Sequence, residues 1–223
     1  MVRIKRRKLY LDKKVLAALA VTAIIAGTVG VAKRIVPVGE TVTEVLDGDS
    51  FKIGKGQTVR LLSLDSPETK YCYGDRAKEN LERKILGKKV ILKELQTDRY
   101  GRIMALTYQN GELINEYMIK NGLALHLWDN TNEKTKKILQ NANEFARENR
   151  LGIFSAECYQ IEPPNPKCAI KGSVNPATKE KTYTMPTCDR YNLTVVEKYK
   201  GEEWFCTEAV AKKEGFVKSK NCN

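Results

Sequence analysis

The chain has 223 residues, enough for one domain of ordinary size and a smaller appendix, and its formal net charge is +12. Residues 1–39 hold nine Lys or Arg against one acidic residue, whereas the two signs nearly balance over residues 40–155 and 156–223. The net charge therefore does not by itself indicate a nucleic-acid-binding protein, because most of it lies in one terminal segment.

That terminal segment predicts membrane targeting. A basic head precedes eighteen uncharged residues, 15–32, which end at Lys33 and Arg34. A run of this length can just span a bilayer, with the basic head on the cytoplasmic side. A cleaved signal peptide is the alternative. We expect residues 1–36 to be an anchor or signal and the remainder to be exported, either membrane-anchored with an extracytoplasmic domain or secreted.

The cysteines predict disulfides. An even number in an exported chain is typical of disulfide bonding, and six cysteines allow fifteen pairings. A zinc site is disfavoured, because no Cys-x-x-Cys pair occurs and His126 is the only histidine. The cysteines are Cys72, Cys158, Cys168, Cys188, Cys206 and Cys222.

From residue 40 onward, the pattern of apolar residues and turns predicts short strands followed by helices. Five strands are expected, at residues 41–46, 50–53, 57–64, 89–95 and 102–108. Three helices are expected, over residues 77–86, from near 113 to a stop at 121–122, and from 131 or 132 to about 151. Together these elements predict an α+β fold, an oligonucleotide-binding (OB-fold) barrel of five strands capped by three helices.

The last predicted helix has an apolar face. Its spacing places Ile138, Ala142, Phe145 and Ala146 toward the core.

A Pro-rich stretch divides the exported part. Residues 160–167 read as a stiff linker between a domain at 40–159 and a module at 168–223. The module holds four of the six cysteines, as expected for a small unit that buries little core.

Polar residues gather where the predicted strands end. Asp49 follows a turn, and Asp65 ends the third strand. If the first three strands lie side by side, these carboxylates are placed to bind a hard divalent cation. Asp-Gly at a hairpin is also a common turn former, so either carboxylate alone has an ordinary structural explanation.

Three further residues suit phosphodiester hydrolysis. That reaction needs a base to position water, a role that Glu68 suits, and positive charge on the phosphate. Arg60 and Arg102 suit the second role, because a guanidinium can bind phosphate oxygens in pairs. An arginine on a strand often only pairs with an exposed acid, so the joint occurrence of the clusters carries the hypothesis.

These clusters resemble the signature blocks of the staphylococcal nuclease (thermonuclease) family, in the same order and spacing. The blocks are residues 46–50, 60–69 and 98–102, and similar segments follow at 108–116, 121–124 and 151–154. The resemblance covers roughly residues 40–155, and three linked motifs are far more specific than one. It implies an OB-fold barrel and calcium-dependent cleavage of DNA and RNA at the bond to the 5′ oxygen, leaving 3′-phosphate products.

The resemblance also implies the ligands of the calcium ion. Asp49 and Asp65 would bind through their carboxylates and Ser66 through its backbone carbonyl. Ser66 stands where threonine is commoner in the family, a harmless change if only the carbonyl binds.

The remaining roles follow in the same way. Glu68 corresponds to the proposed general base, Arg60 and Arg102 to the phosphate-binding arginines, and Tyr100 to a tyrosine near the nucleotide. A non-catalytic barrel that binds nucleic acid or protein is the alternative. A degenerate copy of the family should lack one of the five charged site residues, and all five are present.

The chain departs from the family in two places. The basic loop after Glu68 is shortened to residues 70–75, which leaves substrate affinity and preference open. His126 and Trp128 stand where the family often has stacking tyrosines. Trp128 suits either base stacking or core packing, and His126 is expected to be a packed histidine.

The resemblance extends to the cysteines. Cys72 and Cys158 resemble a pair found in some exported members. The tail is similar to a small cysteine-containing module appended to bacterial exported nucleases, in which we expect Cys168 to pair with Cys206 and Cys188 with Cys222. The expected partners are DNA and RNA, with a membrane at the N-terminal segment, and the expected state is a monomer.

Overall fold

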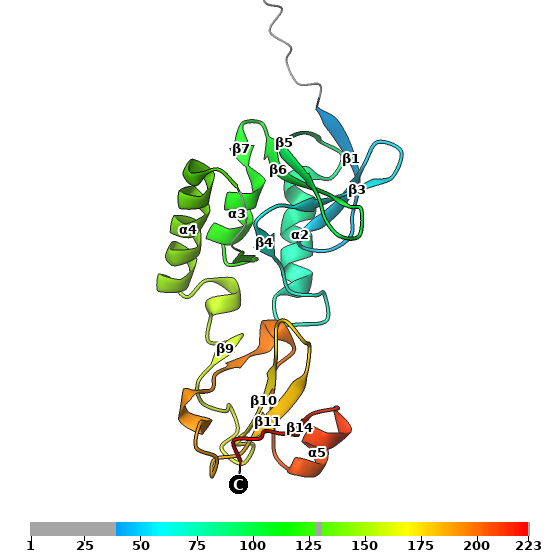
Figure 1. Ribbon diagram of the computed structural model, residues 1–223. Helices are drawn as coiled ribbons and strands as arrows, with labels where there is room; N and C mark the ends of the chain where they lie inside the picture. Colours follow the sequence, from blue (N-terminus) through cyan, green and yellow to red (C-terminus); the bar gives the residue numbers. More distant parts are fainter. Residues whose placement is uncertain (1–38, 128–130, 223) are drawn as a thin grey trace, which may run out of the picture. The chain divides into compact units, whose positions relative to one another are not determined.

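The computed structural model describes residues 39–127 and 131–222 of the chain (Figure 1). The predicted targeting segment and Trp128 lie outside these residues. In the described part, no helix combines the length and the apolar character that a membrane crossing requires.

Five strands form a closed barrel. In sheet order, antiparallel pairing joins β3, β2, β1, β5 and β6. The barrel closes where β3 pairs in parallel with β6, with Val59 opposite Ile103. The strands are β1 (Glu40–Val45), β2 (Ser50–Ile53), β3 (Gln57–Leu61), β5 (Lys89–Thr97) and β6 (Ile103–Gln109). The predicted five-stranded OB-fold barrel is confirmed.

The third strand is shorter than predicted. β3 ends at Leu61, Ser63 adopts a left-handed conformation with φ 66°, and the chain continues as β4 (Leu64–Asp65). β4 leaves the barrel and pairs instead with β8 (Leu125–His126). The prediction of one strand over residues 57–64 was wrong, because this turn interrupts an apolar run that has no Gly or Pro to mark it.

Three helices cover the barrel, as predicted. The first is α2 (Gly74–Ile85), whose buried side chains repeat at the helical spacing of Ala77, Leu81 and Ile85. Next comes α3 (Ile114–Lys120), which follows the two-residue strand β7 (Glu112–Leu113).

The last of these helices is α4 (Glu133–Glu148), which Asn132 caps by accepting a hydrogen bond from the Thr135 N–H at 3.0 Å. Its buried stripe includes Leu139 and Ala142. The prediction that Phe145 faces inward was wrong: its side chain is 44% exposed, with the Lys120 ammonium over its ring.

A buried amide connects α3 to the barrel. Asn115 accepts a hydrogen bond from the Thr107 N–H at 2.9 Å and donates one to the Leu62 carbonyl at 2.8 Å. It thereby satisfies backbone groups where β3 has ended. This contact holds the chain at the point where it turns toward Asp65.

The tail forms a small sheet with its own core. Its strand order is β13, β10, β11 and β14, and Phe205 contacts Phe216 with ring centroids 4.9 Å apart. The elements are β10 (Ile170–Val174), β11 (Lys181–Thr184), η2 (Tyr191–Leu193), β12 (Val196–Glu197), η3 (Lys198–Lys200), β13 (Glu203–Phe205), α5 (Glu208–Lys213) and β14 (Val217–Lys218).

All three predicted disulfides are present. Cys168 is bonded to Cys206 and Cys188 to Cys222 within the tail. Cys72 is bonded to Cys158, which joins the loop before α2 to the segment after η1 (Gly152–Phe154).

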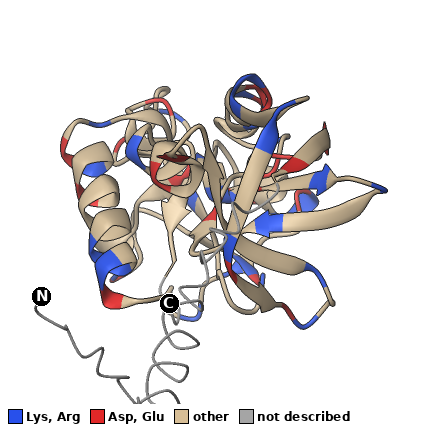
Figure 2. Ribbon diagram, turned by 90° about the horizontal axis from the view of Figure 1, so that it is seen from above, with Lys and Arg blue, Asp and Glu red and all other residues tan. Residues whose placement is uncertain are grey.

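The tail also hydrogen-bonds to the segment that follows the barrel. β9 (Tyr159–Gln160) pairs with β12, and the Trp204 indole N–H donates to Gln160 Oε1 at 2.9 Å. Acidic and basic residues are interspersed over the helices and strands in the view of Figure 2, consistent with the near balance of charge outside the N-terminal segment.

Glu202 is expected to make the stability of the tail depend on pH. This buried carboxylate accepts hydrogen bonds from the N–H groups of Val174 and Glu197, yet burial outweighs them and raises its pKa. The folded state therefore holds the proton more tightly than the unfolded state does, and the free energy of unfolding should fall as pH rises from below 4.5 through the raised pKa.

Urea titrations at several pH values check this expectation. Glu202→Gln should remove this part of the pH dependence, whereas Glu203→Gln at the exposed neighbour should leave it unchanged. Equal pH slopes in the wild type and the Glu202→Gln protein would contradict the assignment.

Candidate active site

Asp49, in the turn before β2, is held in position by hydrogen bonds of its backbone and by its neighbours. Its carbonyl accepts a hydrogen bond from the Leu61 N–H at 2.8 Å, and its own N–H donates to Asp47 Oδ1 at 2.9 Å. A Cβ added to Gly48 would lie 2.5 Å from Ser66 Oγ. The turn thus packs directly against the Ser66 segment, and only glycine allows this approach.

Arg60 joins the two predicted carboxylate ligands. Its Nη1 donates to Asp49 Oδ1 at 2.6 Å, and its Nη2 donates to Asp65 Oδ1 at 2.5 Å. The Ser66 N–H donates to the other carboxylate oxygen of Asp49 at 3.1 Å. The structure therefore brings together Asp49, Arg60, Asp65 and Ser66, four of the predicted site residues.

Burial determines the electrostatics of this cluster. It raises the pKa of Asp49 to about 7, a shift that Arg60 reduces and Asp47 increases. Burial also acts to lower the pKa of Arg60, but Asp49 and Asp65 outweigh it and raise that pKa. Arg60 alone thus compensates the negative charge of Asp49 incompletely.

The donor set suits a hard cation. Asp49 is 2% exposed, whereas the Asp65 side chain is 56% exposed, so the pair has one buried and one open side. Across residues 39–127 and 131–222, no three His, Cys, Asp or Glu side chains gather as a metal site. Two carboxylates would therefore need backbone oxygens and water to complete a calcium shell, which calcium accepts.

Glu68 is positioned by its backbone. Its carbonyl accepts a hydrogen bond from the Tyr71 N–H at 2.8 Å, and a Cβ on Gly74 would lie 2.0 Å from that carbonyl oxygen. The disulfide of Cys72 holds the same loop. The Glu68 side chain is exposed and forms no ion pair with a described residue, so it is open to solvent and substrate.

Arg102 lies beside the cluster but has its own partner. It precedes Ile103, which pairs with Val59 next to Arg60, and its Nε donates to Asp98 Oδ2 at 2.7 Å. Its side chain is 36% exposed. The structure thus places Arg102 directly before β6, the strand that pairs with β3 and Arg60, without joining it to the carboxylates.

The two aromatic candidates differ in exposure. Tyr100 is 68% exposed, and the Arg102 guanidinium lies 5.6 Å from its ring. His126 is half-buried in β8 opposite Leu64, with its N–H donating to Asn143 Oδ1 at 3.3 Å. Tyr100 is therefore the more accessible of the two to a ligand.

Three residues that support the site were not predicted. Gly48 and Gly74 allow close backbone approaches, and Asn115 holds the chain after β3. Their positions in turns and in a helix face suggested only ordinary roles. Nothing in the local pattern marks the distant segment that each of them meets.

The fold is thus a closed OB-fold barrel in which one arginine bridges two carboxylates, Asp49 just before β2 and Asp65 at the end of β4. Residues 58–156 match the family Staphylococcal nuclease homologue. The chain is 32% identical over 118 residues to an uncharacterized endonuclease of Escherichia coli, covering 51% of this chain and 75% of that protein. It is also 32% identical over 125 residues to the thermonuclease of Staphylococcus hyicus, covering 51% and 74%.

The chain therefore belongs to the staphylococcal nuclease family. A plant relative, the staphylococcal-like nuclease CAN1 of Arabidopsis thaliana, is 35% identical over 104 residues, or 47% of this chain and 31% of that protein. The family match ends at residue 156, before the module of residues 168–223. A nuclease-family domain makes nucleic acids the substrate class.

Proposed function

We propose that the chain is an exported, calcium-dependent nuclease that hydrolyses phosphodiester bonds of DNA and RNA and leaves 3′-phosphate products. The observation that carries the proposal is the bridge from Arg60 to both Asp49 and Asp65, beside the Ser66 backbone. This arrangement brings two carboxylates and one guanidinium together, groups suited to binding a hard cation and a phosphate.

Asp49, Asp65 and the Ser66 carbonyl would hold the calcium ion. Bound there, calcium supplies positive charge toward the phosphate oxygens. The raised pKa of Asp49 supports this assignment, because a buried carboxylate that one arginine compensates incompletely gains from a nearby cation.

The chain's own residues perform the other steps. Glu68 takes the proton from the attacking water, and Arg60 and Arg102 stabilise the charge that develops on the phosphorane. The terminal nitrogens of Arg102 remain available, since the ion pair with Asp98 uses Nε. Tyr100 offers an exposed ring beside that arginine for the nucleotide.

The N-terminal segment completes the proposal. Residues 1–36 would act as a membrane anchor or a cleaved signal, and the rest would work as an extracytoplasmic monomer. The three disulfides support an oxidising location.

Glu68→Gln tests the assignment of the base. The variant should fold normally, because the side chain is exposed, and its kcat should fall by about 10²–10⁴-fold, the contribution of a positioned acid–base group. Cleavage of labelled DNA in calcium measures the effect, with Glu79→Gln at an exposed position of α2 as the matched control. An equally active Glu68→Gln protein would remove this role. A folded wild-type protein that binds DNA without cleaving it would instead favour a non-catalytic binding barrel.

A further inference from the structure

A cavity of about 700 Å³ lies beside the end of α4 and η1, against the segment of residues 156–164. No residue of the Arg60 cluster lines it. Its volume is in the range of small-ligand sites in proteins. It is therefore a second candidate site with its own chemistry.

Two arginines give the cavity a positive wall. Arg147 and Arg150 both line it, and neither forms an ion pair with any residue in the described ranges. Arg147 instead lies over the Phe154 ring, with its guanidinium 4.7 Å from the ring centroid. Glu162 is the one acidic residue among the lining residues. Guanidinium groups without carboxylate partners are suited to binding phosphate oxygens.

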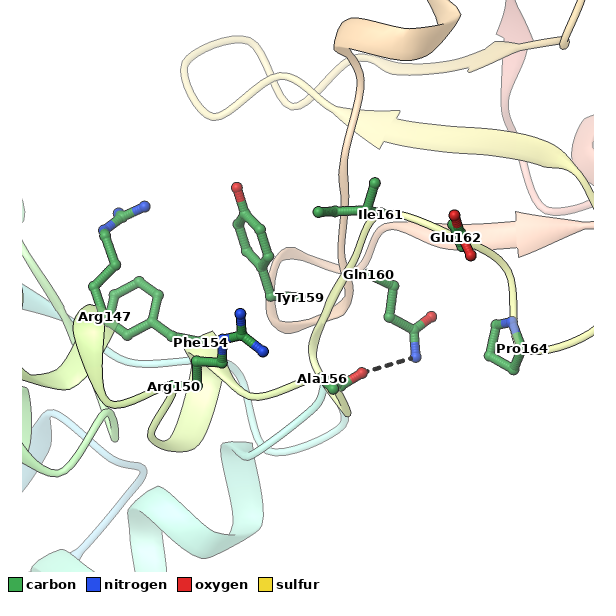
Figure 3. Close-up of a pocket in the computed structure, with 9 residues that line it drawn as sticks. All are labelled: Arg147, Arg150, Phe154, Ala156, Tyr159, Gln160, Ile161, Glu162 and Pro164. Atoms are coloured by element: carbon green, nitrogen blue, oxygen red, sulfur yellow. Dashed lines mark hydrogen bonds between the residues drawn. The ribbon is translucent and has the colours of Figure 1, made fainter.

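The opposite wall is aromatic and apolar. Figure 3 shows the Tyr159 ring between the two arginines and Ile161. Ile161 is 65% exposed and lines the same cavity, so its apolar side chain is accessible to a ligand there. A flat ring beside an apolar side chain offers a face on which a nucleobase can stack.

Hydrogen bonds fix this wall in place. Gln160 Nε2 donates to the Ala156 carbonyl at 3.4 Å, the dashed line of Figure 3, and to the Glu157 carbonyl at 3.2 Å. Its Oε1 accepts from the Trp204 indole. These three bonds fix Gln160, so the backbone between Tyr159 and Ile161 loses little freedom when a ligand binds.

We propose that this cavity binds one nucleotide unit of a single-stranded nucleic acid, with Arg147 and Arg150 on the phosphate and Tyr159 against the base. An acidic peptide would satisfy the arginines but would leave the aromatic wall without a planar partner. The site goes beyond the proposed function, since binding here needs neither calcium nor cleavage.

The test uses the full-length protein, a fluorescently labelled oligothymidylate and excess chelator, so that binding is measured without cleavage. Arg147→Ala/Arg150→Ala should weaken binding about tenfold and reduce the salt slope by about 0.7, the value for one single-strand phosphate. The matched control is Lys134→Ala/Lys137→Ala, which removes the same charge from exposed positions of the same helix. Thermal midpoints establish that both proteins are folded.

A second variant tests the stacking role. The wild type should bind an abasic strand several-fold more weakly than oligothymidylate, and Tyr159→Leu should remove that preference. The proposal would be overturned if the two double variants lost affinity equally. It would also be overturned if polyglutamate competed as strongly as an oligonucleotide of equal charge. Failure of cleavage with this binding pattern retained would refute the proposed function alone.

Discussion

Replacing Arg60 by alanine is expected to lower phosphodiester cleavage by about 10²–10³-fold, the loss that follows removal of one group stabilising transition-state charge. The same change leaves Asp49 buried without its cationic partner. Breaking a buried ion pair typically costs about 3–5 kcal/mol of stability, and the cost is smaller at a pH where Asp49, whose pKa is already about 7, takes up a proton. The exposed pair with Asp65 should contribute little to that loss.

The two effects can be separated by a second substitution. At a pH high enough to ionise Asp49 without its partner, Asp49→Asn in the Arg60→Ala background removes the uncompensated charge, so stability in chelator should largely return while cleavage stays low. Arg60→Lys keeps the charge, but an ammonium cannot bridge both carboxylates as the guanidinium fork does, and its activity should also be reduced. Urea unfolding in chelator and cleavage in calcium measure the two quantities. Full activity in Arg60→Lys would show that the bridge is dispensable.

Removing the disulfide between Cys72 and Cys158 should have the second large effect. The bond joins residues 86 apart, and closing a loop of that size stabilises a fold by about 2–5 kcal/mol. The loop it holds also carries Tyr71, whose N–H binds the Glu68 carbonyl. Cys72→Ser/Cys158→Ser is therefore expected to lower both the unfolding free energy and kcat.

The matched control is the double serine variant of Cys188 and Cys222. That disulfide lies in the tail and closes a sequence separation of 34 residues. Its loss should destabilise the tail while leaving kcat near the wild-type value. The role of the first disulfide in positioning Glu68 would be refuted by equal kcat values in all three proteins at a temperature where they are folded.

Much of the barrel could be predicted from the sequence, because its strands and helices follow local rules. Alternation and turn residues marked the strands, and helical spacing marked α2. The break after Leu61 could not be predicted in this way, since it depends on Ser63 adopting a positive φ and on the distant Asn115. Phe145 was misplaced because the stripe of Ile138, Ala142 and Phe145 fits the helical period as well as the buried stripe of Leu139, Ala142 and Ala146 does.

The site was predictable in part for the same reason. The expected side-by-side arrangement of the first three strands implied that Asp49 and Asp65 could meet, and the family resemblance supplied the roles. The bridging by Arg60 and the incomplete compensation of Asp49 are properties of the folded arrangement and have no local signature. The cavity at Arg147 and Arg150 combines α4, η1 and β9, which no single motif joins.

The most direct test of the central claim is cleavage of end-labelled single-stranded and duplex DNA by the full-length protein, in calcium and in excess chelator. We predict cleavage in calcium, no cleavage in chelator, recovery when calcium is restored, and 3′-phosphate ends on the products. Equal cleavage in chelator would contradict a calcium site at Asp49 and Asp65. A folded protein that binds DNA but does not cleave it in calcium would contradict the nuclease itself.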